Sequence, residues 1–120
     1  MDVVVSEQPT GLATVIRLAG QLDVDSAPTL RAAVEEMLDR QVNRIVVDLT
    51  ELDFCDSIGL STFVLAHNSC TESGGYLRLA APSAFLLRVL STVGLRTRLP
   101  VYRGVPEACA GDETGLLTDA

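Results

Sequence analysis

The apolar positions of this chain follow two patterns, helical spacing in some stretches and short β-branched runs in others. The clearest helical stretch follows Ser26 and Pro28: apolar residues recur at i, i+3, i+4, i+7 and i+8 from Leu30 to Leu38, which is one face of an amphipathic helix. We expect Ser26 to cap this helix and Pro28 to lie in its first turn. The run at residues 45–49 is mostly β-branched and continuous, which is typical of a strand buried on both faces.

The remaining apolar runs predict further strands and helices before and after this helix and the strand at 45–49. We expect strands at residues 3–5, 13–19, 76–80 and 99–102, and helices at 58–72, from Pro82 to Gly94, and from Pro106. The first two strands are close enough in sequence to form an antiparallel hairpin, whereas alternating strands and helices after residue 20 imply parallel β-α-β units. The predicted fold class is α/β, a mixed, largely parallel β-sheet of four to five strands with three to four α-helices. In the helix at 58–72 the apolar residues are spread widely, which indicates a side exposed to a partner.

The chain of 120 residues fits a single domain. We place this domain at residues 1–110 and expect the acidic tail at 111–120 to be disordered. No apolar run approaches the ~18 residues of a membrane span, and the N-terminus lacks the pattern of a secretory signal. We therefore expect a cytoplasmic protein without direct membrane contact.

Charge and residue usage exclude several classes of function. The net charge of −7 argues against a nucleic-acid partner. All nine basic residues are arginine, so lysine-dependent P-loop, Schiff-base and phospho-aspartate receiver chemistry is excluded. Three widely spaced cysteines suit a reducing compartment, and one histidine without a CxxC pair predicts no structural zinc site. We expect no metal and no cofactor.

The candidate functional stretch is residues 53–60, between the strand at 45–49 and the helix at 58–72. Ser57 falls at or next to the N-cap of that helix, where unpaired N–H groups and the helix dipole favour negative charge. A phosphate on its hydroxyl would occupy an anion site. Capping alone would explain Asp56-Ser57, but Gly59 favours a function: first-turn glycine costs about 1 kcal/mol and offers a bare backbone that another molecule can approach. We interpret Ser57 as an exposed, phosphorylatable switch.

Other uses of these residues are less consistent with the sequence. A hydrolase elbow needs glycine where Cys55 stands, and His67 lies ten residues along the helix, about 15 Å from Ser57, too far to act as its base. Cys55 is either redox-sensitive or, as is commoner, a small buried hydrophobe. A magnesium site like that of a phospho-aspartate receiver would use four acids at strand ends, namely Asp23, Asp48, Asp53 and Asp56. The lysine that accompanies such a site is missing from this chain. We favour Asp23 and Asp56 as a functional pair, because strand-to-helix loops share one rim of a sheet.

Five segments together resemble the STAS domain of anti-sigma factor antagonists: residues 20–23, 46–49, 52–60, 74–75 and 94–95. The similarity runs from about residue 4 to 108, and the Asp-Ser-x-Gly-Leu core is its most specific part. It implies that Ser57 is phosphorylated by a partner that is both anti-sigma factor and serine kinase, and is restored by a serine phosphatase. Asp56 is then the motif acid, and Asp23 lies near the partner surface. The predicted partner-binding set is completed by Ile58, Gly59 and Leu60.

The implied function is that of an anti-sigma factor antagonist, a binding protein and not an enzyme, which phosphorylation of Ser57 switches off. The family also contains transporter-associated and lipid-transport-associated members, so a non-phosphorylated scaffold subunit of a transporter or larger signalling assembly stays open. Ile58 takes a position where small residues are common in the family, which bears on the choice of partner. A weak homodimer also stays open.

Overall fold

A computed structural model of the chain describes residues 3–11, 13–92 and 99–117. Its centre is a five-stranded sheet with the strand order β1-β2-β3-β4-β5. Among the described strands, β1 and β2 pair in antiparallel fashion, and the other three pairs are parallel. The mixed, largely parallel sheet is therefore confirmed. The strand bounds are β1 Val3–Pro9, β2 Thr14–Leu22, β3 Arg44–Cys55, β4 Tyr76–Ala80 and β5 Val101–Tyr102.

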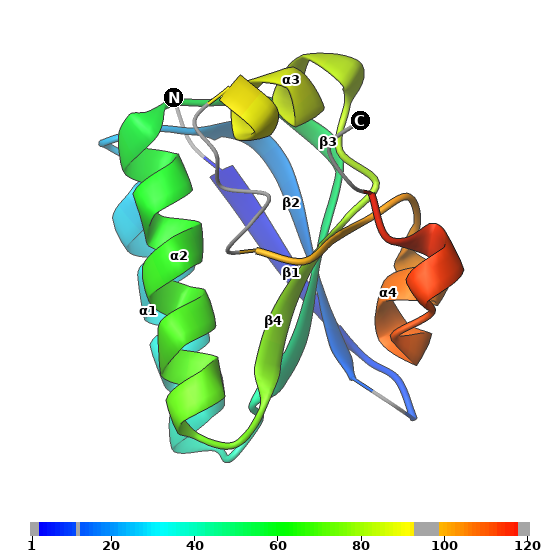
Figure 1. Cartoon of the computed structure of the whole chain (residues 1–120). Helices are drawn as coiled ribbons and strands as arrows, with labels where there is room; N and C mark the ends of the chain where they lie inside the picture. Colours follow the sequence, from blue (N-terminus) through cyan, green and yellow to red (C-terminus); the bar gives the residue numbers. More distant parts are fainter. Residues whose placement is uncertain (1–2, 12, 93–98, 118–120) are drawn as a thin grey trace.

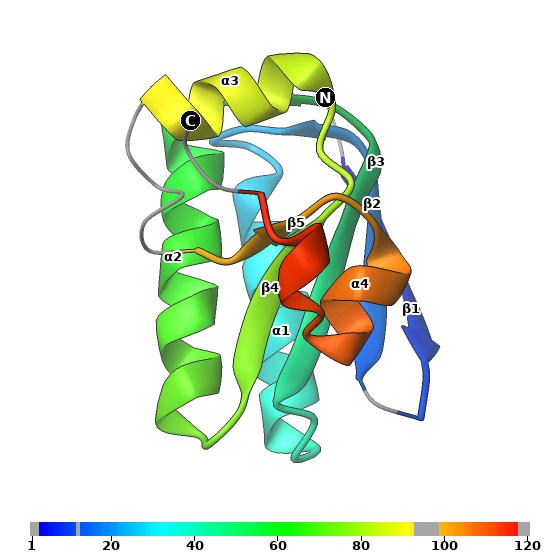
Figure 2. The same ribbon diagram turned by 45° about the vertical axis from the view of Figure 1, so that its right-hand side comes forward.

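The α-helices cover both faces and one end of the sheet. They are α1 Ala27–Asp39, α2 Ser57–Glu72, α3 Ala84–Thr92 and α4 Val105–Ala110. Figure 1 shows α1 and α2 side by side on one face, while α3 crosses the end at which β3 finishes. Figure 2 shows α4 on the opposite face, against β3 and β4. Because alternate strand residues point to opposite faces, Val47 belongs to the main core and its neighbour Val46 to the smaller core under α4.

β3 is longer than the sequence predicts, because its second half, in which polar and apolar residues are mixed, still pairs with β2. Residues Glu51 and Cys55 are in register with Ala19 and Leu22. Shifts in register between residues 17 and 19 and between 20 and 21 accommodate this stretch, as β-bulges do. The stretch at 20–22, beyond the expected end of the second strand at residue 19, is therefore strand, and the prediction that β3 ends at residue 49 is wrong.

The segment after α4 packs against the short strand β5. Gly111 adopts a left-handed conformation (φ 66°) and ends α4, and residues Glu113–Gly115 form a 3-10 helix, η2. The Leu117 N–H then donates to the Val101 carbonyl at 2.7 Å. Where the sequence led us to expect disorder from residue 111, the structure places residues up to 117 along the open edge that two-residue β5 leaves. The predicted end of the third helix, at Gly94, lies outside the described residues.

Among the described helices, none combines the length and the hydropathy needed to cross a lipid bilayer.

Candidate functional site

The ends of β2 and β3 bring two strand-to-helix loops together. Leu22 and Cys55 are register partners, and the Asp56 N–H donates to the Leu22 carbonyl at 3.1 Å. Asp23 and Asp56 are the next residues on the two chains, so their loops leave the sheet at the same edge. The shared rim that we expected for this pair of acids follows directly from this register.

Asp56, and not Ser57, is the N-cap of α2. Its backbone is extended (φ −92°, ψ −176°), and its Oδ1 accepts a hydrogen bond from the Gly59 N–H at 2.8 Å. The Asp56 carbonyl accepts the first helical hydrogen bond, from Leu60 N–H at 2.9 Å. An aspartate in this place satisfies one of the unpaired donors of the first turn and complements the helix dipole.

Ser57 is the first residue of α2 and is exposed. Its carbonyl accepts a hydrogen bond from the Ser61 hydroxyl at 2.9 Å. Within the described part of the chain, its own hydroxyl has no hydrogen-bond partner. The side chain therefore stands at the helix N-terminus with no structural task in capping.

Gly59 has a different role from the one that we inferred from the sequence. It is buried, and a Cβ at this position would lie 2.8 Å from Cys55 Sγ, 2.8 Å from the Leu22 carbonyl oxygen and 2.9 Å from Leu22 Cγ. The bare backbone thus accommodates the end of β2 of this same chain, and not another molecule. The propensity cost of glycine is offset by close packing between α2 and the sheet.

Leu60 is also under the surface, with 4% of its area exposed as part of the main core. Of the six residues predicted to bind a partner, the structure therefore brings Asp23, Asp56, Ser57 and Ile58 to the surface in whole or part. Gly59 and Leu60 hold the first turn of α2 in place from beneath.

Asp23 organises the loop between β2 and α1. Its Oδ1 accepts hydrogen bonds from the N–H groups of Asp25 and Ser26, each at 3.0 Å. These bonds, that from the Ser26 N–H foremost, hold the pKa of Asp23 below its ordinary value. Ser26 occupies the N-cap position of α1 as predicted, but its hydroxyl donates to the Gln21 carbonyl at 2.7 Å and makes no cap hydrogen bond. The loop that presents Asp23 is therefore fixed by its own hydrogen bonds.

Four large apolar side chains, which we call the apolar rim, are exposed on the loop after β2, on β3 and on α2. Val24, Phe54, Ile58 and Leu65 are exposed over 60%, 40%, 46% and 55% of their area. Val24, Ile58 and Leu65 line a cavity of about 340 Å³ between α1 and α2, together with Arg31. The wide spread of apolar residues along α2 predicted such a side. Val24 could have been found as an apolar residue between two acids, Asp23 and Asp25, in the loop after β2. Phe54, near the end of β3, follows Asp53 in the same way.

The other candidate residues lie apart from this rim. Asp48 is buried in the middle of β3, where it pairs with Arg17 at 3.6 Å and accepts from the Thr50 hydroxyl at 2.6 Å. It shares the face of Val46, opposite α1 and α2, so the four acids do not converge. Within the described residues, no group of three or more His, Cys, Asp or Glu side chains could hold a metal ion. His67 is half-buried, with Nδ1 3.1 Å from the Leu77 carbonyl oxygen on β4.

Cys55 is buried beneath the first turn of α2. Burial, with a smaller effect of the Asp56 carboxylate, raises the pKa of its thiol to about 12. The thiol is therefore protonated at neutral pH and lacks the thiolate that redox reactions need. Of the two interpretations, the small buried hydrophobe fits the structure.

Comparison with known proteins adds evidence to this geometry. The family model described as "Mlab, STAS domain" matches residues 5–102. The chain is 29% identical over 89 residues to the anti-sigma F factor antagonist of Paenibacillus polymyxa, which covers 73% of this chain and 76% of the relative. It is 31% identical over 81 residues to the anti-sigma-B factor antagonist of Bacillus subtilis (strain 168), covering 68% and 73%. In fold it is similar to the crystal structure of an anti-sigma factor antagonist from Mycobacterium paratuberculosis, with a TM-score of 0.82, 20% identity and coverage of 92% and 94%.

Proposed function

Because the chain belongs to the STAS domain family, we propose that it is an anti-sigma factor antagonist that phosphorylation of Ser57 switches off. In this proposal it binds an anti-sigma factor that is also a serine kinase, and a serine phosphatase restores the free hydroxyl. The names of its relatives, antagonists of anti-sigma F and anti-sigma-B factors, support the first part. The chain acts as a binding protein that regulates sigma-factor-dependent transcription.

The observation that carries the proposed switch is the division of roles between Asp56 and Ser57. Asp56 caps α2, whereas the exposed Ser57 hydroxyl has no partner among the described residues. A kinase can therefore modify Ser57 without removing a hydrogen bond that α2 needs. The apolar rim on the neighbouring elements supplies contact area for a partner, because exposed clusters of large apolar residues mark interaction sites.

The effect of a phosphate follows from its charge and its place. It adds about −1.5 to −2 charges at a helix N-terminus, where the helix dipole favours negative charge by about 0.3–2 kcal/mol. This offsets part of the repulsion from Asp56, so the domain stays folded. In a partner interface the same charge without a matched cation costs several kcal/mol, and each ~1.4 kcal/mol is a tenfold loss of affinity.

The partner surface in this proposal consists of the four residues of the predicted set that reach the surface. The exposed Ser57 and Ile58 and the half-buried Asp23 and Asp56 make the direct contacts. Ile58 adds apolar area on the side of α1, since it lines the cavity there. In this proposal the large Ile58 side chain, which is unusual at this position in the family, is therefore in contact with the partner.

The first experiment is intact-mass spectrometry after incubation with ATP and each purified anti-sigma factor/kinase encoded in the same genome. We expect one added phosphate, mapped to Ser57. Ser57→Ala should abolish the gain, whereas Ser61→Ala should not, because Ser61 is exposed on the same helix one turn later. Phosphate on any other residue, or none with every kinase, contradicts the proposed switch.

The second experiment is a pull-down with the same kinases. Ser57→Ala should retain the anti-sigma factor and Ser57→Asp should lose it, and both variants should keep a folded melting curve. Retention by Ser57→Asp at wild-type level would mean that charge at this position does not control binding.

A second candidate function is the non-phosphorylated scaffold subunit of a transporter or larger assembly. It stays open because the STAS domain family, whose model matches residues 5–102, also contains transporter-associated members. Co-purification with a membrane complex and no labelling of Ser57 would support this alternative over the switch.

A further inference from the structure

A long groove runs between α1 and α2, away from Ser57. The cavity next to Ile58 shares Arg31, Thr62 and Leu65 with a second cavity of about 300 Å³, which continues to Leu38 and Glu72. The two cavities therefore adjoin, and together we call them the groove. Along α2 their lining residues extend from Ile58 to Glu72, about 21 Å at 1.5 Å per residue. This length matches about four turns of a helix.

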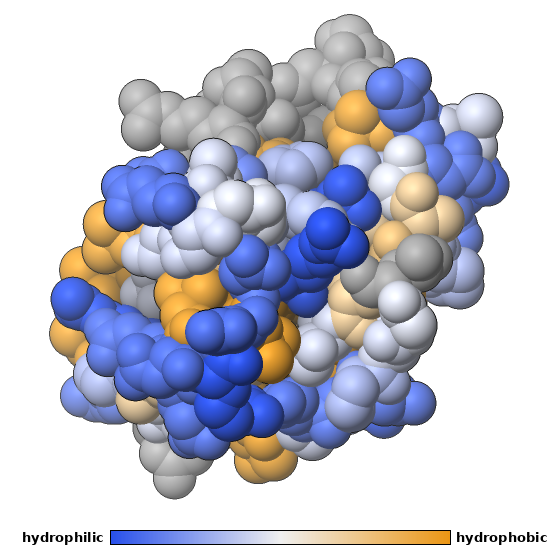
Figure 3. Space-filling view, turned by 90° about the horizontal axis from the view of Figure 1, so that it is seen from below, coloured by the Kyte–Doolittle hydropathy of each residue, from blue (hydrophilic) through white to orange (hydrophobic). Residues whose placement is uncertain are grey.

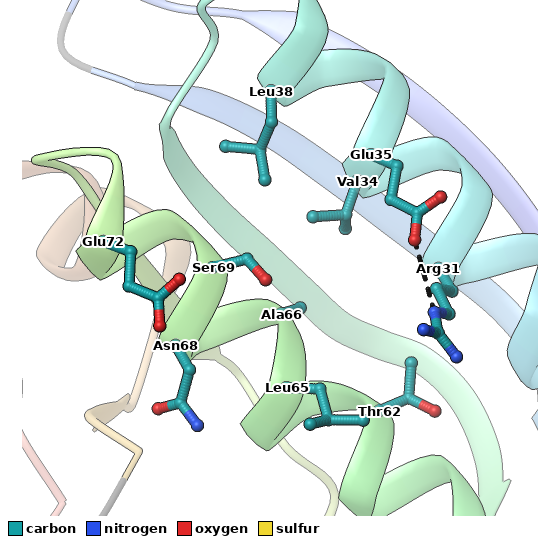
Figure 4. A pocket seen from close by; sticks show the side chains of 10 residues that line it. All are labelled: Arg31, Val34, Glu35, Leu38, Thr62, Leu65, Ala66, Asn68, Ser69 and Glu72. Atoms are coloured by element: carbon teal, nitrogen blue, oxygen red, sulfur yellow. Dashed lines mark hydrogen bonds and ion pairs between the residues drawn. The ribbon is translucent and has the colours of Figure 1, made fainter.

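Small side chains on α2 keep the groove open. Thr62, Ala66 and Ser69 recur at i, i+4 and i+7, so they share the face that is turned to α1. Figure 4 shows Val34 and Leu38 of α1 pointing across to this face. Leu65 on the rim is 55% exposed. The result is an apolar trough with a large apolar side chain on its edge.

The charge around the groove selects its occupant. The outer surface of α1 and α2 carries four exposed carboxylates, those of Glu35, Glu36, Asp39 and Glu72. Of these, Glu35 and Glu72 line the groove. Against them stand Arg31, which lines the groove and pairs with Glu35 at 3.3 Å, and Arg40, which pairs with Glu7 at 2.9 Å and with Glu36 at 3.8 Å. Figure 3 shows apolar side chains framed by hydrophilic ones at the end of the molecule where both helices finish. Two copies of this acidic surface would repel each other, as the net charge of −7 also predicts, whereas a basic partner would be attracted.

We propose that the groove binds a basic amphipathic helix of the anti-sigma factor, with apolar anchors at i, i+3 or i+4 and i+7 seated on Val34, Leu38 and Ala66. This inference rests on the proposed function, but it adds a second contact region that the switch residue does not touch. The far end of the groove lies about 21 Å from the first turn of α2, beyond the screening length of about 8 Å at physiological salt. A phosphate on Ser57 therefore acts on one end of the interface and leaves the contacts at the other end intact.

The test is the dissociation constant for each purified anti-sigma factor/kinase, measured by calorimetry on matched variants of the full chain. Ser69→Arg puts bulk and positive charge into the groove from an exposed position. Thr71→Arg makes a similar change on the same helix at an exposed residue outside the groove. We expect Ser69→Arg to weaken binding about tenfold or more, equal to about 1.4 kcal/mol, and Thr71→Arg to change it less than about twofold. Leu65→Ser, checked by circular dichroism, serves as a second groove variant if Ser69→Arg does not fold.

The outcomes separate this inference from the proposed switch. If Ser57→Asp abolishes binding but Ser69→Arg and Thr71→Arg behave alike, the groove proposal is overturned and the switch stands. If Ser69→Arg weakens binding while Ser57→Asp binds like the wild type, the switch fails and the groove proposal stands. Binding of no anti-sigma factor by the wild type overturns both. A dimer of the chain alone that Ser69→Arg dissociates, seen by sedimentation, would assign the groove to a second copy and overturn the proposal.

Discussion

Replacing Gly59 by alanine tests how α2 is held against the sheet. The added Cβ would lie 2.8 Å from both Cys55 Sγ and the Leu22 carbonyl oxygen. One of these is a backbone atom, which cannot turn aside as the end of a flexible side chain can. The first turn of α2 must therefore move away from the end of β2.

The size of the effect follows from three contributions. Overpacking of this kind costs about 1–3 kcal/mol. Movement also weakens the hydrogen bond from Asp56 N–H to the Leu22 carbonyl, at 3.1 Å, which is worth about 0.5–1.5 kcal/mol. Alanine recovers about 1 kcal/mol of helix propensity. We expect Gly59→Ala to lower the free energy of unfolding by about 1–3 kcal/mol.

The assay is urea unfolding of Gly59→Ala beside a matched control, Gly11→Ala. No other atom lies within 4 Å of a Cβ built at Gly11, so alanine there should leave stability unchanged or raise it by about 0.4–1 kcal/mol. A double mutant with Cys55→Ala removes one of the two contacts at 2.8 Å. It should recover part of the loss, with a coupling energy of about 0.5 kcal/mol or more.

A Gly59→Ala variant as stable as the wild type, or more stable, would refute this reasoning. If that variant also lost its partner, the glycine would be a contact site for another molecule, which is the role that the sequence alone suggested. Loss of stability with retained binding would assign it to internal packing. The two measurements together decide between these roles.

Three further predictions concern the cap, the opposite face and the thiols. Asp56→Ala should cost about 0.5–2 kcal/mol through loss of the N-cap, and Asp56→Asn should cost less, as thermal melts would show. Arg78→Leu should lower amide-exchange protection in α4, because the Arg78 guanidinium donates to the Ala108 carbonyl at 2.9 Å; unchanged protection would contradict this role. At pH 8 a thiol reagent should modify Cys109 first and Cys55 last in the native protein, since burial raises the Cys55 pKa to about 12. Because that thiol ionises in the unfolded chain before the folded one, its contribution to stability should fall as pH rises from about 9 towards 12.

The sequence predicts the layers of this fold well, because they depend on periodicity. The helical spacing from Leu30 to Leu38 corresponds to α1, and the β-branched run at 45–49 lies in β3. The end of β3 was missed because half of residues 50–55 are polar and interrupt the β-branched run, and their register with the bulged end of β2 makes them strand. Such pairing depends on a segment about thirty residues away, which a local pattern does not contain.

The sequence places the cap of α2 only to within one residue, at Ser57 or next to it, and the structure assigns it to Asp56. A serine or an aspartate can cap a helix equally well, so the sequence could not decide between Asp56 and Ser57. The sequence also could not predict the close approach of Gly59 in α2 to the Leu22 carbonyl oxygen in β2, because these elements are far apart in the sequence and the contact involves a backbone atom. Propensity revealed that glycine is costly there, but only the packing shows what offsets the cost.

The cap of α2 is Asp56, and the proposed phosphorylation site, Ser57, is the next residue. This separation explains how a single phosphate could control binding without refolding the domain. If Ser57 were the cap, its modification would alter the acceptor that completes the first turn of α2. Instead Asp56 keeps the hydrogen bond from Gly59 N–H at 2.8 Å, and the Ser57 hydroxyl is outside that arrangement. The N–H groups of Ser57 and Ile58 belong to the first turn, which has no acceptors in a preceding turn, so the new charge would meet donors on its own helix. The free-energy difference between the two states then arises in the partner interface, where an unmatched charge is most costly.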